Sequence, residues 1–296
     1  MQIVGDLTLP QMDKEVDMYL DEADKQKLAA LLSEAKKKYS RSALERLEEA
    51  FAISIGAKQP DNTGDPLQGA RDFFFPGLTA KPWHETREFP MCAKLEQTWE
   101  VIRDEMKYAL DNKRGFQHYL RRETSQQTDS NSEVPKEWKA LYLKEHTEEF
   151  PESRAMCPET TRIIMEEPRV ENYVIFSALD PGGHIKPHHA TYNWTFNIHL
   201  GLIVPDNCAL RVGKDEPRRW EEGKCLVFDG SFEHEAWNRG DFTRFILLIA
   251  IFHPDLTDIE ISLLKQVNLD LAKADVAHDI ALREGKKQLE DKRWWV

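Results

Sequence analysis

The histidines of this sequence are unevenly distributed, and histidine is the commonest metal-binding side chain in proteins. Ten are present, and six of them lie between residues 172 and 256. These six are His184, His188, His189, His199, His234 and His253. A single histidine is more often a hydrogen-bonded structural residue than a ligand. Six within one region indicate a metal site there, and the structural alternative stays open for each ring.

Arg244 is the one charged residue in the apolar run Phe242–Phe252. A guanidinium in such a setting is costly to bury unless a carboxylate pairs with it. The partner is either an aspartate or glutamate of the chain, or a dicarboxylate ligand held by the guanidinium fork. Arg244 by itself does not decide between them.

Polar and apolar side chains alternate along a predicted strand, Tyr192–Val204. Its polar positions are Asn193, Thr195, Asn197 and His199. Because successive side chains of a strand point to opposite faces, these four share one face. In a surface sheet that face is solvated, whereas in a barrel it lines a polar cavity.

Short β segments separated by turns must position these residues. The predicted strands are Tyr173–Ala178, Tyr192–Val204, Cys208–Val212, Lys224–Phe228 and Phe242–Phe252. Turn signals rich in Pro, Gly, Asp and Asn separate them. Many short strands at such spacing indicate a sandwich or jelly roll.

Helical sequence flanks the β region. Residues 14–56 carry leucines at helical spacing, and further helices are predicted at about Met91–Leu110 and in the tail, Asp255 to Lys292. The polar stretch Ser125–Pro135 has no periodicity and is predicted as a surface loop. It is either a plain connection or a lid over a site.

The overall composition favours a globular protein that does not bind a nucleic-acid polymer. The chain has 296 residues, 41% of them hydrophobic, and a formal net charge of −12. That charge argues against binding a nucleic-acid polymer, although a local basic pocket can still hold a small anion. No apolar run approaches the ~18 residues of a membrane span, and residues 1–10 do not resemble a secretory signal. We therefore expect a cytoplasmic protein without a membrane partner.

Two stretches, Phe73–Trp83 and Pro181–Leu256, resemble the aspartyl/asparaginyl β-hydroxylases. The motifs that carry the resemblance are Pro187-His188, His199-Leu200-Gly201-Leu202, Trp220-Glu221-Glu222-Gly223-Lys224, Phe228-Asp229-Gly230-Ser231-Phe232-Glu233-His234-Glu235 and Phe252-His253-Pro254-Asp255-Leu256. So long an ordered series is specific. It covers most of the chain from about residue 70.

This resemblance implies a mainly β fold with flanking helices (α+β), built on a double-stranded β-helix of the jelly-roll or cupin type. Residues 1–70 would form a helical region packed on the core. Residues 71–256 would form the oxygenase domain and residues 257–296 a C-terminal helix.

The same resemblance implies an oxygenase that uses Fe(II), 2-oxoglutarate and O2. His188 and His234 would bind the iron. 2-Oxoglutarate would be held by Arg244, Ser177 and His199, and Asn197 is a further candidate contact. A dicarboxylate would then be the partner that Arg244 needs.

Ala190 occupies the position, two residues after His188, where most 2-oxoglutarate oxygenases carry a third, carboxylate ligand. Alanine cannot bind iron, so water or a halide ion could take that place. Hydroxylases of the resembled family carry Gly here, and radical halogenases of this cofactor class carry Ala or Gly. We therefore predict chloride as a cofactor and chlorination of an unactivated carbon, with hydroxylation of an aspartyl or asparaginyl residue or a small molecule as the alternative.

The substrate expectation also comes from resemblance. The chain resembles nucleotide halogenases that chlorinate the 2′ carbon of deoxyadenosine monophosphate, which predicts a nucleotide substrate and a role in nucleoside natural-product biosynthesis. Candidate substrate contacts are Lys186, Trp194, Arg218 and Arg219. Basic surface residues are usually just solvated and a tryptophan is usually core, so each has a plain structural alternative.

Overall fold

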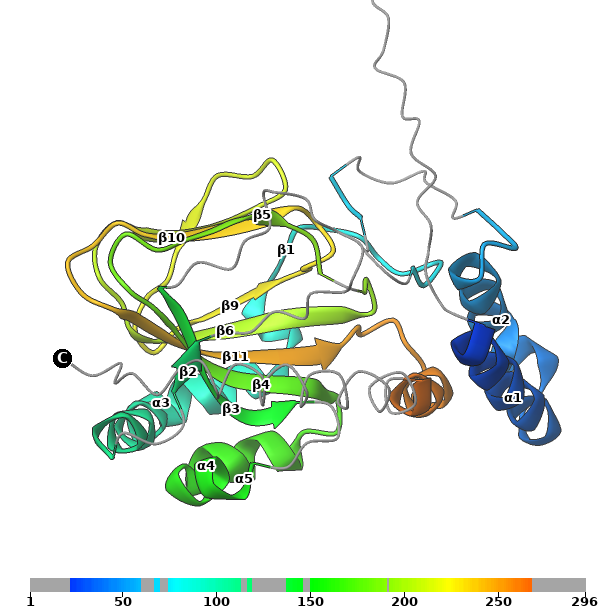
Figure 1. The fold of residues 1–296 in the computed structure, drawn as a ribbon, viewed down its shortest axis with the longest axis horizontal. Coiled ribbons are helices and arrows are strands. Elements are labelled where there is room, and N and C mark those ends of the chain that lie inside the picture. The colour runs from blue at the N-terminus through cyan, green and yellow to red at the C-terminus, as the bar shows by residue number, and fades with distance from the viewer. Residues whose placement is uncertain are drawn as a thin grey trace, which may run out of the picture.

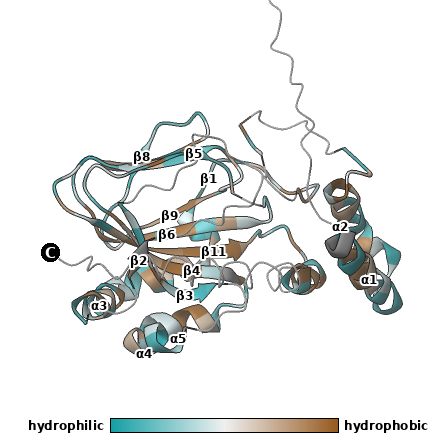
Figure 2. Ribbon diagram, in the orientation of Figure 1, coloured by the Kyte–Doolittle hydropathy of each residue, from teal (hydrophilic) through white to brown (hydrophobic). Residues whose placement is uncertain are grey.

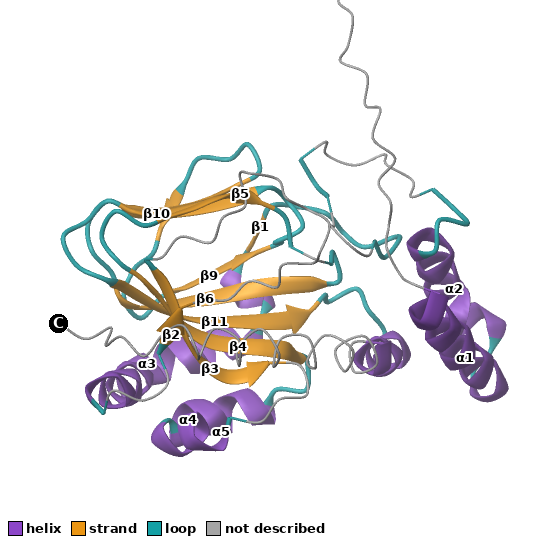
Figure 3. Cartoon of the chain, viewed as in Figure 1, coloured by secondary structure: helices purple, strands orange, loops and turns teal. Residues whose placement is uncertain are grey.

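Two antiparallel β-sheets face each other, and helices cover the outer side of the larger one (Figure 1). The computed structural model describes residues 22–59, 67–69, 74–112, 116–118, 137–145, 150–190 and 192–267. Figure 3 shows the smaller sheet opposite the larger one, with α3, α4 and α5 on the far side. The chain therefore has the double-stranded β-helix core with flanking helices that the sequence predicts.

Among the described residues, the larger sheet has seven strands and the smaller has four. The order of the larger is β1 (Trp83–His84), β9 (Cys225–Phe228), β6 (Thr195–Ile203), β11 (Arg244–Phe252), β4 (Val170–Leu179), β3 (Trp138–Glu145) and β2 (Gln117–His118). The order of the smaller is β5 (His184–His188), β10 (His234–Asn238), β7 (Cys208–Val212) and β8 (Arg218–Arg219).

The described helices are α1 (Glu22–Lys38), α2 (Arg41–Ser54), the short 3-10 helix η1 (Thr86–Glu88), α3 (Pro90–Asp111), α4 (Pro151–Met156), α5 (Pro158–Glu166) and a helical stretch at 258–267. In the part of the chain that the structure describes, none of the helices has both the length and the apolar character needed to cross a membrane.

The larger sheet buries different partners on its two faces because side chains alternate along each strand. Leu247 and Ile249 of β11 belong to the cluster that packs under α3 and α5. The intervening Ile246 packs with residues of the smaller sheet instead. Figure 2 shows the apolar residues concentrated on the central strands. Polar residues on the inner face therefore lie between the two sheets.

Helices α1 and α2 pack with the C-terminal part of the described chain. Leu47 of α2, Trp194 and Leu264 share one buried cluster. Arg46 of α2 adds a bidentate ion pair with Glu260. Its Nε and Nη2 atoms lie 2.9 and 2.6 Å from the two carboxylate oxygens. The helical region is thus packed against the β-helix and the helix that follows it.

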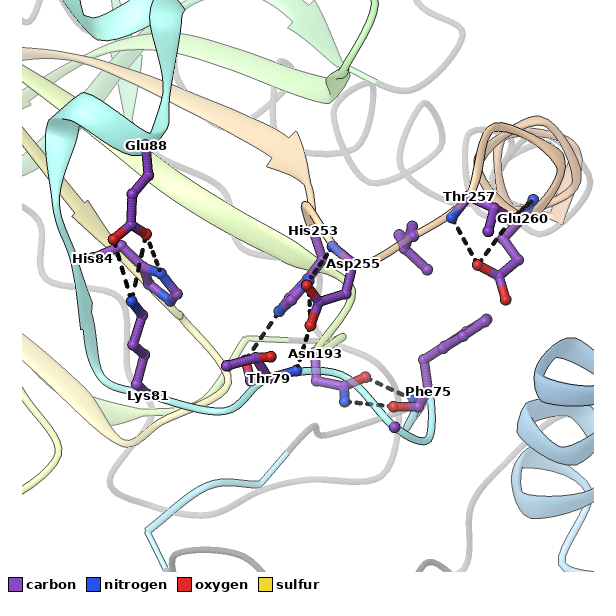
Figure 4. A network of polar contacts seen from close by, with 12 residues as sticks. Phe75, Thr79, Lys81, His84, Glu88, Asn193, His253, Asp255, Thr257 and Glu260 are labelled. Carbon is purple, nitrogen blue, oxygen red and sulfur yellow. Dashed lines mark hydrogen bonds and ion pairs between the residues drawn. The ribbon is translucent and has the colours of Figure 1, made fainter.

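Side chains of Asn193, His253 and Asp255 hold the segment 74–88 in place by hydrogen bonds to its main chain (Figure 4). The Asn193 side chain donates to the carbonyl of Phe75 (2.9 Å) and accepts from the N–H of Phe75 (2.7 Å). Thr79 donates its N–H to Asp255 Oδ2 (2.8 Å), and its carbonyl accepts from His253 Nε2 (3.0 Å). These bonds place Trp83 and its neighbour in register with β9.

The turn between β9 and β10 is built on a buried carboxyl group. Asp229 Oδ1 accepts from the N–H (2.8 Å) and the hydroxyl (2.6 Å) of Ser231, and the residue is 1% exposed. Burial raises the pKa of Asp229 to about 7, against the opposing effect of the two hydrogen bonds. The turn leads into β10, which begins at His234.

The predicted strands are confirmed with shifted ends, and several elements are additional. The strand predicted at Tyr192–Val204 begins only at Thr195, because the Asn193 side chain forms hydrogen bonds with the main chain of Phe75. The sequence does not predict β3, β5, β10, α4 or α5. β5 and β10 are short and carry histidine and glutamate rather than an apolar alternation. The predicted loop Ser125–Pro135 lies outside the described residues.

Replacing Asn193 should destabilise the chain, because one amide satisfies two buried main-chain groups. We expect Asn193→Ala to lower the free energy of unfolding by about 2–3 kcal/mol, since both groups of Phe75 lose their partner away from water. Urea denaturation followed by circular dichroism measures the change. Asn112→Ala is the control, because this exposed amide bonds one carbonyl at the end of α3. Equal losses in the two variants would contradict the assigned role of Asn193.

The raised pKa of Asp229 predicts a pH-dependent stability. In the folded chain the carboxyl stays protonated up to about pH 7, whereas the unfolded chain ionises near 3.8. The Asp229 carboxyl therefore contributes to the free energy of unfolding at low pH. This contribution is lost as the pH rises from about 3.8 to about 7.

We expect Asp229→Asn, which keeps an acceptor for Ser231, to gain about 2 kcal/mol over the wild type between pH 5 and pH 8. Urea denaturation of the metal-free full chain at both pH values measures this gain. The control is Asp206→Asn, whose side chain is 92% exposed. A pH-independent difference between wild type and Asp229→Asn would show that the carboxyl is already ionised in the fold.

Candidate active site

Two histidines from neighbouring strands of the smaller sheet lie ring against ring. His188 ends β5 and His234 begins β10; they are register partners, with ring centroids 4.1 Å apart. Nδ1 of His188 donates to the carbonyl of Lys186 (2.7 Å), and Nδ1 of His234 to that of Phe232 (2.9 Å). Because a carbonyl only accepts, each neutral ring carries its lone pair on Nε2. The arrangement suits two imidazole ligands of one metal ion.

Ala190 stands beside this pair. Its N–H donates to the carbonyl of Gly230 (2.7 Å). A Cβ atom at Gly230 would lie 3.2 Å from Ala190 Cβ, 3.7 Å from His234 Cε1 and 2.6 Å from Asn197 Nδ2. Position 230 therefore has no room for a side chain, and Ala190, Asn197 and Gly230 meet next to the histidine pair without contributing a carboxylate.

Glu233, Glu235 and Asp180, all near the pair in sequence, are engaged elsewhere. Arg211 binds Glu233 (2.9 Å) and Glu235 (2.6 Å), and Glu235 also contacts His184 (2.7 Å). Asp180 bonds the Thr243 hydroxyl at 2.8 Å. Within the described ranges, no group of three or more His, Cys, Asp or Glu side chains is placed to hold a metal ion. Among the residues that the structure describes, a metal held here would have two protein ligands.

Arg244 lies between the two sheets and is 1% exposed. Its Nη2 donates to Ser177 Oγ (3.3 Å), and its Nε is buried without a hydrogen-bond partner. No acidic side chain in the described part of the chain pairs with it. Burial lowers the pKa of Arg244 to about 10, so the guanidinium stays positive at neutral pH. Of the two partners open to Arg244, the arrangement favours an anionic ligand over an internal carboxylate.

Ser177 is oriented by two donors. Its Oγ accepts from Arg244 Nη2 and from the indole N–H of Trp138 on β3 (2.9 Å). A hydroxyl has two acceptor lone pairs and one hydrogen, so both lone pairs are used. The remaining O–H can then act only as a donor.

His199 lies on the inner face of β6 and is 5% exposed. Its Nδ1 accepts from the indole N–H of Trp220 (3.3 Å), while its Nε2 is buried without a partner. Burial, and then the nearby charges of Arg244 and His234, lower its pKa well below the usual value, so the ring is neutral. Trp220 donates to Nδ1, so the hydrogen of the neutral ring lies on Nε2.

These residues fit the cosubstrate that the sequence implies. Arg244, Ser177 and His199 provide a buried positive charge and donors only, which matches the acceptor-only carboxylates of 2-oxoglutarate. Of the three, His199 adjoins the histidine pair, since the Phe228 ring lies 4.9 Å from that of His199 and 5.4 Å from that of His234. Two unpaired buried donors would otherwise be costly to keep.

The candidate substrate contacts are dispersed. Lys186 is exposed on β5, and Arg218 lies 4.3 Å over the ring of Trp83. Arg219 is bound to Asp206 at 2.7 Å. Trp194 is fully buried in the cluster with α1 and α2, stacked on Tyr192, so its ring is core and we do not retain it as a base-stacking residue.

Several residues of the site are not found from sequence reasoning. Trp138 and Trp220 each donate to a candidate cosubstrate ligand, and Gly230 closes the space beside Ala190. Trp220 and Gly230 stand in motifs that carry the family resemblance, which was the available signal. Trp138 had none, because its strand is not predicted.

The sequence model of the family described as aspartyl/asparaginyl beta-hydroxylase matches residues 96–254, which is more than half of the chain. The human aspartyl/asparaginyl beta-hydroxylase is 31% identical over 189 residues, covering 61% of this chain and 24% of that protein. The ornithine lipid ester-linked acyl 2-hydroxylase of Rhizobium tropici is 32% identical over 176 residues, covering 58% and 61%.

A third relative, aspartate beta-hydroxylase domain-containing protein 2 of Xenopus tropicalis, is 30% identical over 252 residues and matches 79% of this chain. The chain covers 63% of that relative, so it spans less than two thirds of each of the three. The matched region contains both histidines of the pair, Ala190 and Arg244. This chain belongs to the aspartyl/asparaginyl β-hydroxylase family.

Proposed function

We propose that this chain is an Fe(II)- and 2-oxoglutarate-dependent oxygenase that oxidises an aliphatic C–H bond of a small molecule. The observation that carries the proposal is the buried, cationic Arg244, which lacks an acidic partner among the described residues. It contacts Trp220, which bonds His199, and the rings of His199 and His234 both pack against Phe228. A charge in that position is stabilised by a bound dicarboxylate.

Each residue has a distinct task in this proposal. His188 and His234 would hold the iron through Nε2, with their Nδ1 atoms fixed by main-chain carbonyls. Arg244, Ser177 and His199 would bind 2-oxoglutarate, with Asn197 as a further contact. When bound, iron, 2-oxoglutarate and O2 supply the oxidant for the substrate. Ala190 and Gly230 keep side chains away from the remaining position beside the metal.

Hydroxylation is the reaction that the relatives support. The names of two of them place a hydroxyl group on a saturated carbon next to a carbonyl, namely the β-carbon of an aspartyl or asparaginyl residue and carbon 2 of an acyl chain. We propose the same reaction here. A small anionic molecule is the proposed substrate, with Lys186 and Arg218 as candidate contacts.

Chlorination is a second candidate, and the observation that favours it is Ala190. A methyl group beside a two-histidine metal site leaves room for chloride, which would supply the negative charge that a third carboxylate ligand supplies elsewhere. Nucleotides such as deoxyadenosine monophosphate are the substrates proposed for this reaction.

Removal of either histidine should abolish stoichiometric iron binding. We expect His188→Ala or His234→Ala to weaken Fe(II) affinity by about 100-fold or more, because one protein ligand would remain. Iron content after anaerobic equilibrium dialysis measures it. His184→Gln is the matched control, since this ring lies on the same strand but contacts Glu235. Retained iron in both alanine variants would refute the metal assignment.

The reaction is tested by its products. Purified chain is incubated with Fe(II), 2-oxoglutarate and O2, with and without chloride, and with an aspartyl peptide, a fatty-acyl ester or deoxyadenosine monophosphate. Mass spectrometry distinguishes an added oxygen from an added chlorine, and succinate formation reports 2-oxoglutarate turnover. Failure of the iron-loaded chain to bind 2-oxoglutarate would contradict the proposed function.

Changing Ala190 separates the two candidate reactions. We expect Ala190→Asp to remove any chlorination, because the new carboxylate takes the position that chloride needs and repels it. Ala190→Gly, the control, leaves that position open and should keep the wild-type product. If the wild type gives only hydroxylated product in the presence of chloride, the chlorination candidate is rejected.

A further inference from the structure

Trp220 touches two of the residues assigned to the cosubstrate and has no role in the function proposed so far. It is 2% exposed, its indole N–H donates to His199 Nδ1 (3.3 Å), and its ring lies 4.8 Å beneath the guanidinium carbon of Arg244. The rings of Trp220 and His199 are nearly parallel, at 21°. One side chain thus contacts both the cation and a neutral donor of the site.

The hydrogen bond from the Trp220 indole determines which ring nitrogen of His199 carries the hydrogen. An indole nitrogen only donates, so Nδ1 must accept and the hydrogen of the neutral imidazole lies on Nε2. Nε2 is buried and has no partner within the described structure. It is therefore a buried donor without an acceptor among those residues. With the other tautomer, Nε2 would present a lone pair and would repel a carboxylate oxygen.

The turn that carries Trp220 is fixed against the strand that carries His199. The N–H of Gly201 donates to the carbonyl of Lys224 (3.0 Å), and the N–H of Gly223 donates to the carbonyl of Gly201 (2.9 Å). A Cβ at Gly201 would lie 2.2 Å from the carbonyl oxygen of Glu221, so only glycine allows this approach. The motif 220–224 and the motif 199–202 are therefore one structural unit.

We propose that Trp220 is a positioning residue that holds His199 in the Nε2–H tautomer, ready to donate to a carboxylate of the cosubstrate. The link to 2-oxoglutarate rests on the function proposed above, while the tautomer assignment rests on the geometry alone. Stacking under Arg244 additionally stabilises the cation before the anion arrives.

Two measurements test this separately. The full chain, metal-free and labelled with ¹⁵N-histidine, is examined by NMR, which distinguishes protonated from unprotonated ring nitrogens. The His199 signals are identified by their absence in His199→Gln. We expect Nε2 of His199 to be protonated in the wild type, and this preference to be lost in Trp220→Phe, which keeps an aromatic ring but has no N–H.

The second measurement is the KM for 2-oxoglutarate, which we expect to rise about tenfold in Trp220→Phe while kcat at saturating cosubstrate changes less than about threefold. The isosteric analogue 3-benzothienylalanine at position 220, which replaces the N–H by sulphur, should behave like phenylalanine and separates the hydrogen bond from ring size. Trp237→Phe, on the outer face of β10, is the matched control.

The outcomes are distinct. A wild-type His199 protonated on Nδ1, or an unchanged tautomer and KM in both position-220 variants, overturns the proposal. If the wild type has the Nε2–H tautomer and Trp220→Phe loses it, yet neither binds 2-oxoglutarate, the positioning role of Trp220 stands and the proposed oxygenase function fails.

Discussion

The burial of the Arg244 guanidinium is the constraint on which the rest of the site depends. A positive charge buried between two sheets, with Nε unpaired and one hydrogen bond to Ser177, is unfavourable because it has lost its hydration. The surrounding groups mitigate this cost: Trp220 lies against the cation, and Trp138 and Arg244 both donate to Ser177. The neighbouring groups are donors rather than acceptors, so the site is organised for an anion.

Main-chain and indole groups fix the protonation of three histidines before any ligand binds. Carbonyl groups accept from Nδ1 of His188 and His234, which leaves Nε2 of each as the basic atom. Trp220 imposes the opposite pattern on His199, which leaves Nε2 as a donor. The same residue type therefore suits the proposed metal binding on the smaller sheet and the proposed anion binding on the larger one, because the partner of Nδ1 differs.

Family membership and the local chemistry bear on different questions. Membership in the aspartyl/asparaginyl β-hydroxylase family accounts for the arrangement of motifs and supports hydroxylation. The contact of Ala190 with Gly230 concerns a single position beside the proposed metal site, where a small side chain is compatible with either water or chloride. Chlorination therefore rests on one residue, whereas the oxygenase proposal rests on the histidine pair and the buried donors of Arg244, Ser177 and His199 together.

The sequence alone determined the β-rich core, the helices α1 to α3 and the residues that could carry chemistry, because periodicity and residue type are local properties. It predicted Arg244 as a charge in need of a partner. Only the tertiary structure decided that no acidic side chain of the described residues meets it, that Trp194 is core and that Asn193 serves Phe75. It also brought Trp138 and Trp220 to Ser177 and His199, since such contacts join strands and turns far apart in the chain and leave no periodic trace.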